Sequence, residues 1–185
     1  MAVTEVKPIT LEEFLSRSEI KPAAEFLNGQ IISKPMPQGE HSRLQVKLCT
    51  NINLITESQQ IAYAFPELRC TFGGASIVPD VSVFRWDRIP RQPSGRVANR
   101  FESYPDWSIE ILSPDQRHHK VLANLLLCAE FGTELGWLID PADESILVVF
   151  RDRHVQVFQD LDRLPTLNGI NLELTAQQIF SWLSF

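Results

Sequence analysis

The sequence lacks any long apolar run. Its apolar stretches, such as residues 125–129, are far shorter than the ~20 residues that a helix needs to cross a bilayer, so we expect no transmembrane segment and no membrane partner. The N-terminus has no basic start followed by an apolar segment, which is the pattern of a secretory signal. We therefore expect a cytoplasmic protein.

The chain also has few cysteines, and fewer basic than acidic residues. Cys49, Cys70 and Cys128 are spread singly, which gives neither a disulfide framework nor the paired spacing of a zinc site, so we expect reduced and mostly buried thiols. With 17 Lys and Arg against 23 Asp and Glu, the net charge of −6 has the wrong sign for coating nucleic acid by bulk electrostatics. A phosphodiester substrate would need a local device, such as a divalent cation held by carboxylates.

What the chain does contain is enough apolar material for a core. Its 185 residues are 44% hydrophobic and 22% charged, which fits one folded domain over residues 1–185 and is too apolar for intrinsic disorder. Thr10 and Glu13 have the spacing of a capping box, which predicts a short helix from Thr10. Asn28-Gly29 between apolar runs predicts a β-hairpin.

Periodicity and turn signals predict the remaining elements of an α+β domain with a mixed sheet. The Ser-Pro pair at Ser113 and Gln116 have the pattern of a helix start. We expect helices at 42–57, 113–131 and 175–183, strands at 60–65, 68–72 and 77–86 arranged as a meander, a surface loop at 87–105, and further strands at 107–112, 135–139, 145–150 and 154–158.

Two acidic residues in strand contexts are candidates for chemistry. Glu110 interrupts the apolar strand 107–112, where an unpaired charge would cost several kcal/mol, so it must be matched by a cation, a proton or water. Glu110 could instead face solvent on an edge strand or pair with Arg69 or Arg85, and Asp80 after Pro79 could be a turn residue. Carboxylates from adjacent strands that point to the same end would form a hard oxygen site for Mg²⁺ or Mn²⁺.

Together with other motifs, these residues resemble a known family. The pattern is Pro79-Asp80, Glu110-Ile111-Leu112-Ser113-Pro114 and, after a helix, Gly136-Trp137-Leu138-Ile139-Asp140-Pro141. It is similar to the cyanobacterial type of the Uma2 family, formerly DUF820, which is assigned to the PD-(D/E)xK restriction-endonuclease-like superfamily. The resemblance covers roughly residues 10–183 and includes the hairpin at 25–32 and His41. It implies a mixed β-sheet flanked by helices, with an N-terminal β-hairpin extension.

The resemblance also implies a set of site residues. Asp80 and Glu110 would be the metal ligands and would act with a catalytic lysine, which the superfamily places two residues beyond the Glu and Uma2 proteins place on the following helix. Those positions are Leu112 and Asn124 here, and the nearby amine is Lys120. Residues 120 and 124 share a helix face, and the distances along the strand and the helix allow Lys120 to approach Glu110 if the helix folds back over the sheet. Otherwise Lys120 is an exposed helix cation.

Other residues have supporting roles in this hypothesis. Glu25, His41 and Asn124 are accessory candidates through the resemblance or their position, whereas His118 and His119 cannot present both rings to one helix face and indicate no histidine metal site. A further set of cations suited to phosphate contacts lies in the loop at 87–105: Arg88, Arg91, Arg96 and Arg100.

The leading hypothesis is a Mg²⁺- or Mn²⁺-dependent endonuclease that hydrolyses DNA phosphodiester bonds, with Asp80, Glu110 and Lys120 as catalytic residues. The superfamily's nucleases are often dimers, so a homodimer is expected. Because lysine is missing at Leu112 and Asn124, a catalytically impaired nucleic-acid-binding or regulatory module of the same fold is the alternative. A third reading is an oligomeric structural protein without a nucleic-acid role.

Overall fold

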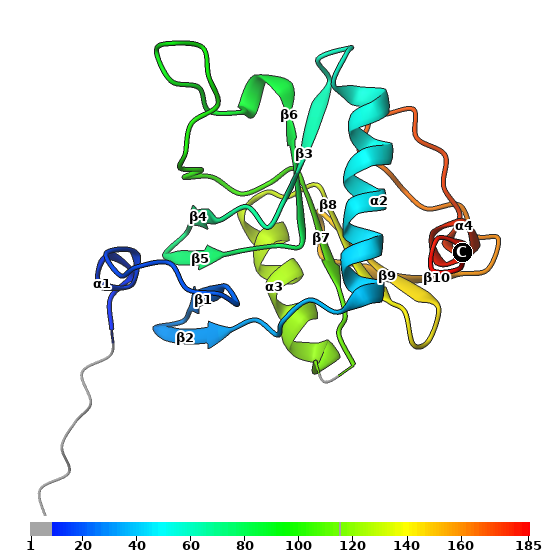
Figure 1. The fold of residues 1–185 in the computed structure, drawn as a ribbon, viewed down its shortest axis with the longest axis horizontal. Coiled ribbons are helices and arrows are strands. Elements are labelled where there is room, and N and C mark those ends of the chain that lie inside the picture. The colour runs from blue at the N-terminus through cyan, green and yellow to red at the C-terminus, as the bar shows by residue number, and fades with distance from the viewer. Residues whose placement is uncertain (1–8, 115) are drawn as a thin grey trace, which may run out of the picture.

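The computed structural model describes residues 9–114 and 116–185, and its largest element is a six-stranded mixed sheet (Figure 1). The strand order is β10-β9-β8-β7-β6-β3, and all neighbours are antiparallel except β7 and β8. These strands are β3 (Ala62–Pro66), β6 (Val81–Arg85), β7 (Trp107–Ile111), β8 (Leu135–Asp140), β9 (Ser145–Phe150) and β10 (Val155–Gln159). Parallel strands need a crossover, and α3 (His118–Phe131) supplies it between β7 and β8.

Helices cover both faces of this sheet. On β7, Ile109 and Ile111 share one apolar cluster with Leu48 of α2 (Gly39–Thr56). On β8, Leu138 packs with Leu125 of α3 in another cluster. Because side chains alternate along a strand, Glu110 points to the face of β7 opposite Ile109 and Ile111, away from α2. The short helix α4 (Ala176–Ser181) and the chain before it complete the cluster on the α2 side.

A second, four-stranded sheet has the order β2-β1-β5-β4 and is entirely antiparallel. It is formed by β1 (Ala24–Leu27), β2 (Gln30–Ser33), β4 (Cys70–Phe72) and β5 (Ala75–Ile77). Asn28 and Gly29 both have positive φ, as a two-residue hairpin turn requires, so the predicted hairpin is confirmed. Gly73 also has positive φ, and a Cβ there would lie 2.0 Å from the Phe131 ring, so this turn seats the small sheet against α3.

The remaining predicted elements are mostly confirmed. The capping box of Thr10 and Glu13 starts α1 (Leu11–Leu15), and the predicted helix at 42–57 corresponds to α2. The loop after β6 begins with a 3₁₀ turn, η1 (Trp86–Arg88). Among the described residues, no helix combines the length and the apolar character that crossing a bilayer requires.

Three predictions about local structure were wrong: the continuous strand at 77–86, the meander and the start of the helix at 113. The expected strand at 77–86 is broken, because β5 ends at Ile77 in the small sheet and β6 starts at Val81 in the large one. Pro79 lies in the break and has no N–H for a strand ladder. The expected meander is therefore absent here, since β3 pairs with β6 whereas β4 pairs with β5.

The helix expected at 113–131 begins later, at His118. The backbone amide of Ser113 donates to Gln116 Oε1 at 3.0 Å, and the amide of Gln116 donates to the Ser113 carbonyl at 2.9 Å. The predicted start signals thus form a separate turn in front of α3, and Arg117 occupies the N-cap position without a side-chain cap. Asp115, which belonged to the predicted start, lies outside the described residues.

Candidate active site

Asp80 lies in the break between the two sheets and is only 3% exposed. Its Oδ2 accepts a hydrogen bond from the backbone amide of Ile111 at 2.7 Å and lies 3.0 Å from His41 Nε2. The Gln45 side chain of α2 donates to the Asp80 backbone carbonyl at 2.8 Å. These contacts fix the carboxylate so that Oδ1 is left for another partner, which is Lys34.

Glu110, on the neighbouring strand β7, is equally buried at 3% exposure. Its Oε2 lies 3.0 Å from Lys34 Nζ, whereas Oε1 is buried without a hydrogen-bond partner in the described part of the chain. Glu110 is therefore neither a solvent-facing edge residue nor a partner of Arg69 or Arg85, whose ion pairs are with Glu19 and Glu134. Glu110 Oε1, a buried oxygen without a hydrogen-bond partner among the described residues, therefore belongs to the same side chain that contacts the Lys34 ammonium group.

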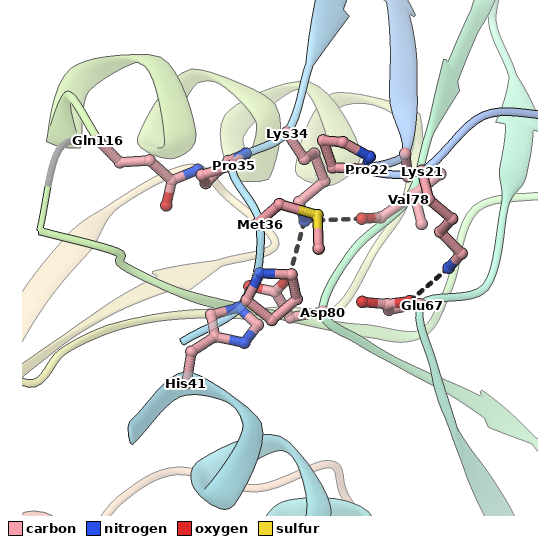
Figure 2. A pocket seen from close by; sticks show the side chains of 12 residues that line it. Lys21, Pro22, Lys34, Pro35, Met36, His41, Glu67, Val78, Asp80 and Gln116 are labelled. Carbon is pink, nitrogen blue, oxygen red and sulfur yellow. Dashed lines mark hydrogen bonds and ion pairs between the residues drawn. The ribbon is translucent and has the colours of Figure 1, made fainter. Parts of the chain in front are cut away.

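The ammonium group of Lys34 joins the two acids, as Figure 2 shows for Asp80. Lys34 follows β2, and its Nζ lies 2.8 Å from Asp80 Oδ1, 3.0 Å from Glu110 Oε2 and 2.8 Å from the Val78 carbonyl oxygen. Lys34 was not among the predicted site residues, because the expected lysine positions lay on the strand of Glu110 and on the helix that follows it. The available signal was a lysine at the end of the hairpin, next to Pro35.

Burial and charge set the protonation of these groups. Burial alone would lower the pKa of Lys34, but the carboxylates of Glu110 and Asp80 outweigh it and raise that pKa above its ordinary value. Burial likewise opposes ionisation of Asp80, yet Lys34 and His41 hold the pKa of Asp80 below its usual range. At Glu110 burial dominates, with Lys34 only partly offsetting it, so the pKa of Glu110 is raised well above 4.5.

A third buried carboxyl group, that of Glu25, comes from strand β1. Its Oε1 accepts a hydrogen bond from the Val78 backbone amide at 2.8 Å, and its Oε2 accepts one from Asn124 Nδ2 at 3.2 Å. Burial raises the pKa of Glu25, partly offset by Lys34. The structure thus brings Glu25, His41 and Asn124 to the site, and Asn124 holds Glu25 by its amide where the family pattern has a lysine.

Lys120 is exposed and lines a groove that Glu25, Lys34 and Glu110 also line. In the described part of the chain it forms no ion pair with Asp80 or Glu110. Residues 120 and 124 share a face, as expected, because both line this groove. The amine that touches both acids is Lys34, so Lys120 is placed at the rim of the site.

The arginine loop lies at the other end of β6 from Asp80, where it projects from the large sheet (Figure 1). Arg88 lies 2.5 Å from Asp106 and donates to the Tyr104 carbonyl, and Arg91 donates to the Trp86 carbonyl. Arg96 and Arg100 are exposed. The structure does not bring these four arginines to the acids, and their contact with nucleic acid stays a prediction.

Two hollows flank the Lys34 side chain. The smaller, of about 230 Å³, is lined by Lys34, His41 and Asp80 and is drawn in Figure 2. The larger, of about 870 Å³, is the groove between the β1–β2 hairpin and α3, and it is lined by Glu25, Lys34 and Glu110. Arg117, Lys120 and Arg153 add positive charge to this groove. The buried acids are therefore reached from solvent along a partly basic surface.

The donor set fits a magnesium or manganese ion bound with help from its substrate. No group of three or more His, Cys, Asp or Glu side chains with metal-binding geometry occurs among residues 9–114 and 116–185. Mg²⁺ commonly uses one or two carboxylates together with waters and substrate phosphates, rather than a complete protein cage. Asp80 and Glu110 supply two such carboxylates. Glu110 Oε1, which has no hydrogen-bond partner among the described residues, is an available ligand atom for the metal.

A mixed sheet between helices, with two buried carboxylates and an ammonium group meeting where β6 begins, defines a protein of the restriction-endonuclease-like class. A family model described as "Putative restriction endonuclease" matches residues 11–177. The chain belongs to the Uma2 family.

A solved structure supports the same assignment. It is described as a "putative nuclease belonging to DUF820 from Anabaena variabilis ATCC 29413", and it is similar to this chain with a TM-score of 0.93 and 49% sequence identity. The match covers 96% of this chain and 100% of that one. No curated protein matches this chain significantly.

Proposed function

We propose that the protein is a metal-dependent endonuclease that hydrolyses DNA phosphodiester bonds, with Asp80 and Glu110 holding Mg²⁺ or Mn²⁺. The observation that carries this proposal is that two buried carboxylates, Asp80 just before β6 and Glu110 on β7, meet at one ammonium group, while Glu110 Oε1 has no hydrogen-bond partner among the described residues. The family assignment supports a nucleic-acid substrate.

A bound metal would polarise the phosphoryl group and lower the pKa of an attacking water. The chain's own groups do the positioning. The Ile111 amide and His41 fix the orientation of the Asp80 carboxylate. Lys34 has a raised pKa and stays an ammonium, so its role is to donate hydrogen bonds to a phosphate oxygen and stabilise negative charge, not to accept a proton.

Lys34 thus takes the catalytic role that sequence analysis gave to Lys120. Lys120, with Arg117 and Arg153, is suited to contact phosphates that flank the scissile bond, because all three line the groove that leads to Glu110. Such contacts position a nucleic acid but do not touch the reacting atoms.

The alternative, a nucleic-acid-binding or regulatory module of the same fold, is favoured by one observation. The family's lysine position on α3 carries Asn124, whose amide is engaged with Glu25. DNA binding that is insensitive to Mg²⁺ and occurs without cleavage would support this alternative over the endonuclease.

Nicking of supercoiled DNA in a Mg²⁺ and Mn²⁺ titration tests the proposal. We expect D80N, E110Q and K34M each to lower the nicking rate at least about 100-fold, whereas K120M lowers it about fivefold through weaker binding. Wild-type rates in D80N would refute the assigned chemistry. Equal losses of nicking rate in K34M and K120M would show that the two lysines do not have the separate roles proposed for them.

We also propose a homodimer, in line with the expectation from the superfamily. Light scattering of the purified protein checks this, with twice the 21.1 kDa chain mass expected.

A further inference from the structure

We propose that Lys34 and a divalent cation exclude one another between Asp80 and Glu110, so that the free protein closes its own metal position until a nucleic-acid phosphate draws Lys34 away. This inference rests on the proposed metal-dependent function. It adds that the metal and the nucleic acid bind cooperatively, with the Lys34 side chain as the link between them.

The first step of the argument is that the Lys34 ammonium uses all of its donors. An ammonium has three N–H groups. Lys34 Nζ has three acceptors within 3.0 Å, namely the Val78 carbonyl, Asp80 Oδ1 and Glu110 Oε2. Both carboxylates therefore already share a cation, so a metal held by the same two carboxylates would compete with this ammonium.

The second step concerns charge. A divalent ion bound to the same two carboxylates would lie within a few ångströms of the ammonium, and at such a distance like charges repel by several kcal/mol near a protein interior. Two buried carboxyl groups, those of Asp80 and Glu110, contact this single ammonium, and a third, that of Glu25, lines the same groove as Lys34. When Lys34 leaves, these acids attract the replacement cation strongly.

The third step is that the Lys34 side chain has open space next to it into which its ammonium group could move. It lines both hollows, and its side chain is 13% exposed although its Nζ is held by the acids. The connection from Lys34 to Gln38 is neither helix nor strand, and a lysine has a flexible four-carbon stem. The larger hollow carries Arg117, Lys120 and Arg153, which would gather phosphates beside it.

The exchange has a thermodynamic consequence. A phosphate that accepts hydrogen bonds from Lys34 replaces the carboxylates as its partner, and the carboxylates become available for the metal. By linkage, the metal must then strengthen nucleic-acid binding by the same factor by which nucleic acid strengthens metal binding.

Mn²⁺ titration followed by the electron paramagnetic resonance of free Mn²⁺ tests the exclusion without any activity measurement. We expect K34M to bind Mn²⁺ about tenfold more tightly than the wild type, within the usual range of such couplings. K34R keeps a cation and should remain within about threefold of the wild type. K120M is the matched control, a lysine of the same groove away from the acids, and should also bind Mn²⁺ like the wild type.

The second arm adds a phosphorothioate oligonucleotide that resists cleavage. It should increase Mn²⁺ affinity in the wild type and in K120M, and by a much smaller factor in K34M. An equal increase in the wild type and K34M would overturn the role of Lys34 as the link. Because losing Lys34 could destabilise the fold, the Mn²⁺-induced rise in melting temperature is measured as well and should be larger for K34M than for the wild type.

The outcomes separate this inference from the proposed function. If Mn²⁺ binds the wild type and K34M equally, or K34M more weakly, and D80N abolishes binding, the metal site stands and the exclusion is wrong. If neither the wild type nor K34M binds Mn²⁺, the proposed function and this inference both fail.

Discussion

A buried aspartate lies next to a cation at each end of strand β6, but only the Asp80 end has more buried acids than cations, as a candidate metal site requires. At the far end, Asp106 is 3% exposed, accepts a hydrogen bond from the Arg85 amide at 2.7 Å and lies 2.5 Å from Arg88. At the near end, Asp80 is equally buried and is held by the Ile111 amide and Lys34. Burial and a cationic partner therefore do not distinguish the two aspartates.

The ends differ in the ratio of acids to cations. Asp106 has Arg88, and its neighbour Glu134 accepts hydrogen bonds from Arg85 Nε and Nη2, each at 2.9 Å, so each acid has its own guanidinium. At the Asp80 end, Asp80 and Glu110 share the single amine of Lys34, whereas the buried carboxyl group of Glu25 has no ion pair and Glu110 Oε1 has no hydrogen-bond partner among the described residues. A structural pair neutralises itself locally, whereas an excess of buried acid over cation marks a place prepared for an additional cation.

The largest expected effect separates the two ends by activity. D80N should abolish nicking, with a loss of at least about 100-fold, because the variant removes a carboxylate of the metal site. D106N should retain the wild-type nicking rate per folded molecule, because Asp106 lies at the end of β6 opposite Asp80 and is paired with Arg88. Rates are compared after correcting for the folded fraction at the assay temperature. A comparable loss in D106N would erase the distinction between the ends.

The next effect separates them by stability. D106N should lower the free energy of unfolding by about 3 kcal/mol, because the Arg88 guanidinium loses its buried charged partner. E110Q should change it by less than about 1 kcal/mol or raise it, because removing one of several crowded acids relieves repulsion. Urea denaturation of both variants beside the wild type measures this. A larger loss in E110Q than in D106N would show that the acid cluster, too, serves the fold.

A smaller effect depends on pH. Burial raises the folded pKa of Glu110, so the folded state holds a proton that the unfolded state has released, and stability falls as pH rises above the ordinary value of 4.5. E110Q mimics the protonated side chain and lacks this loss. The two proteins should have equal stability near pH 4, and E110Q should gain progressively at higher pH. Metal-free denaturation curves across that range check the sign.

The smallest effect concerns the arginines. R117A should reduce the salt dependence of DNA binding by about one unit of the log–log slope, because Arg117 lines the groove that leads to Glu110. The double variant R96A/R100A should change that slope less, because those residues lie on the loop beyond the far end of β6. Fluorescence anisotropy at several salt concentrations compares them. The reverse order would place the DNA on the loop.

One acid of the site was predictable because it breaks a local rule. Glu110 stands out as a charge in an apolar strand, whereas Asp80 after Pro79 is equally typical of a turn and became a candidate mainly through the resemblance to a known family. The hairpin was equally clear from Asn28-Gly29. Such signals are local, and the physical reason for each lies within a few residues.

Lys34 carries no such local signal. It is 46 residues from Asp80 and 76 from Glu110 in sequence, and its contact with them depends on how the small sheet is placed over the large one. The same limit explains the strand break, since only the pairing of β5 and β6 with different sheets shows what Pro79 interrupts. The late start of α3 arose because the turn at Ser113 and Gln116 uses the same residues as a helix cap.

The break at Pro79 places the candidate site at the junction between the two sheets. Glu25 and Lys34 belong to the hairpin at one side of the small sheet, whereas Glu110 and the start of β6 belong to the large sheet, and the chain crosses between them next to Asp80. A slight tilt of one sheet against the other would change the spacing between amine and acids without altering either sheet internally. The spacing between this amine and these acids is therefore governed by how the small sheet packs on the rest of the fold, and a substitution at Gly73, which contacts Phe131 of α3, would change that spacing from a distance.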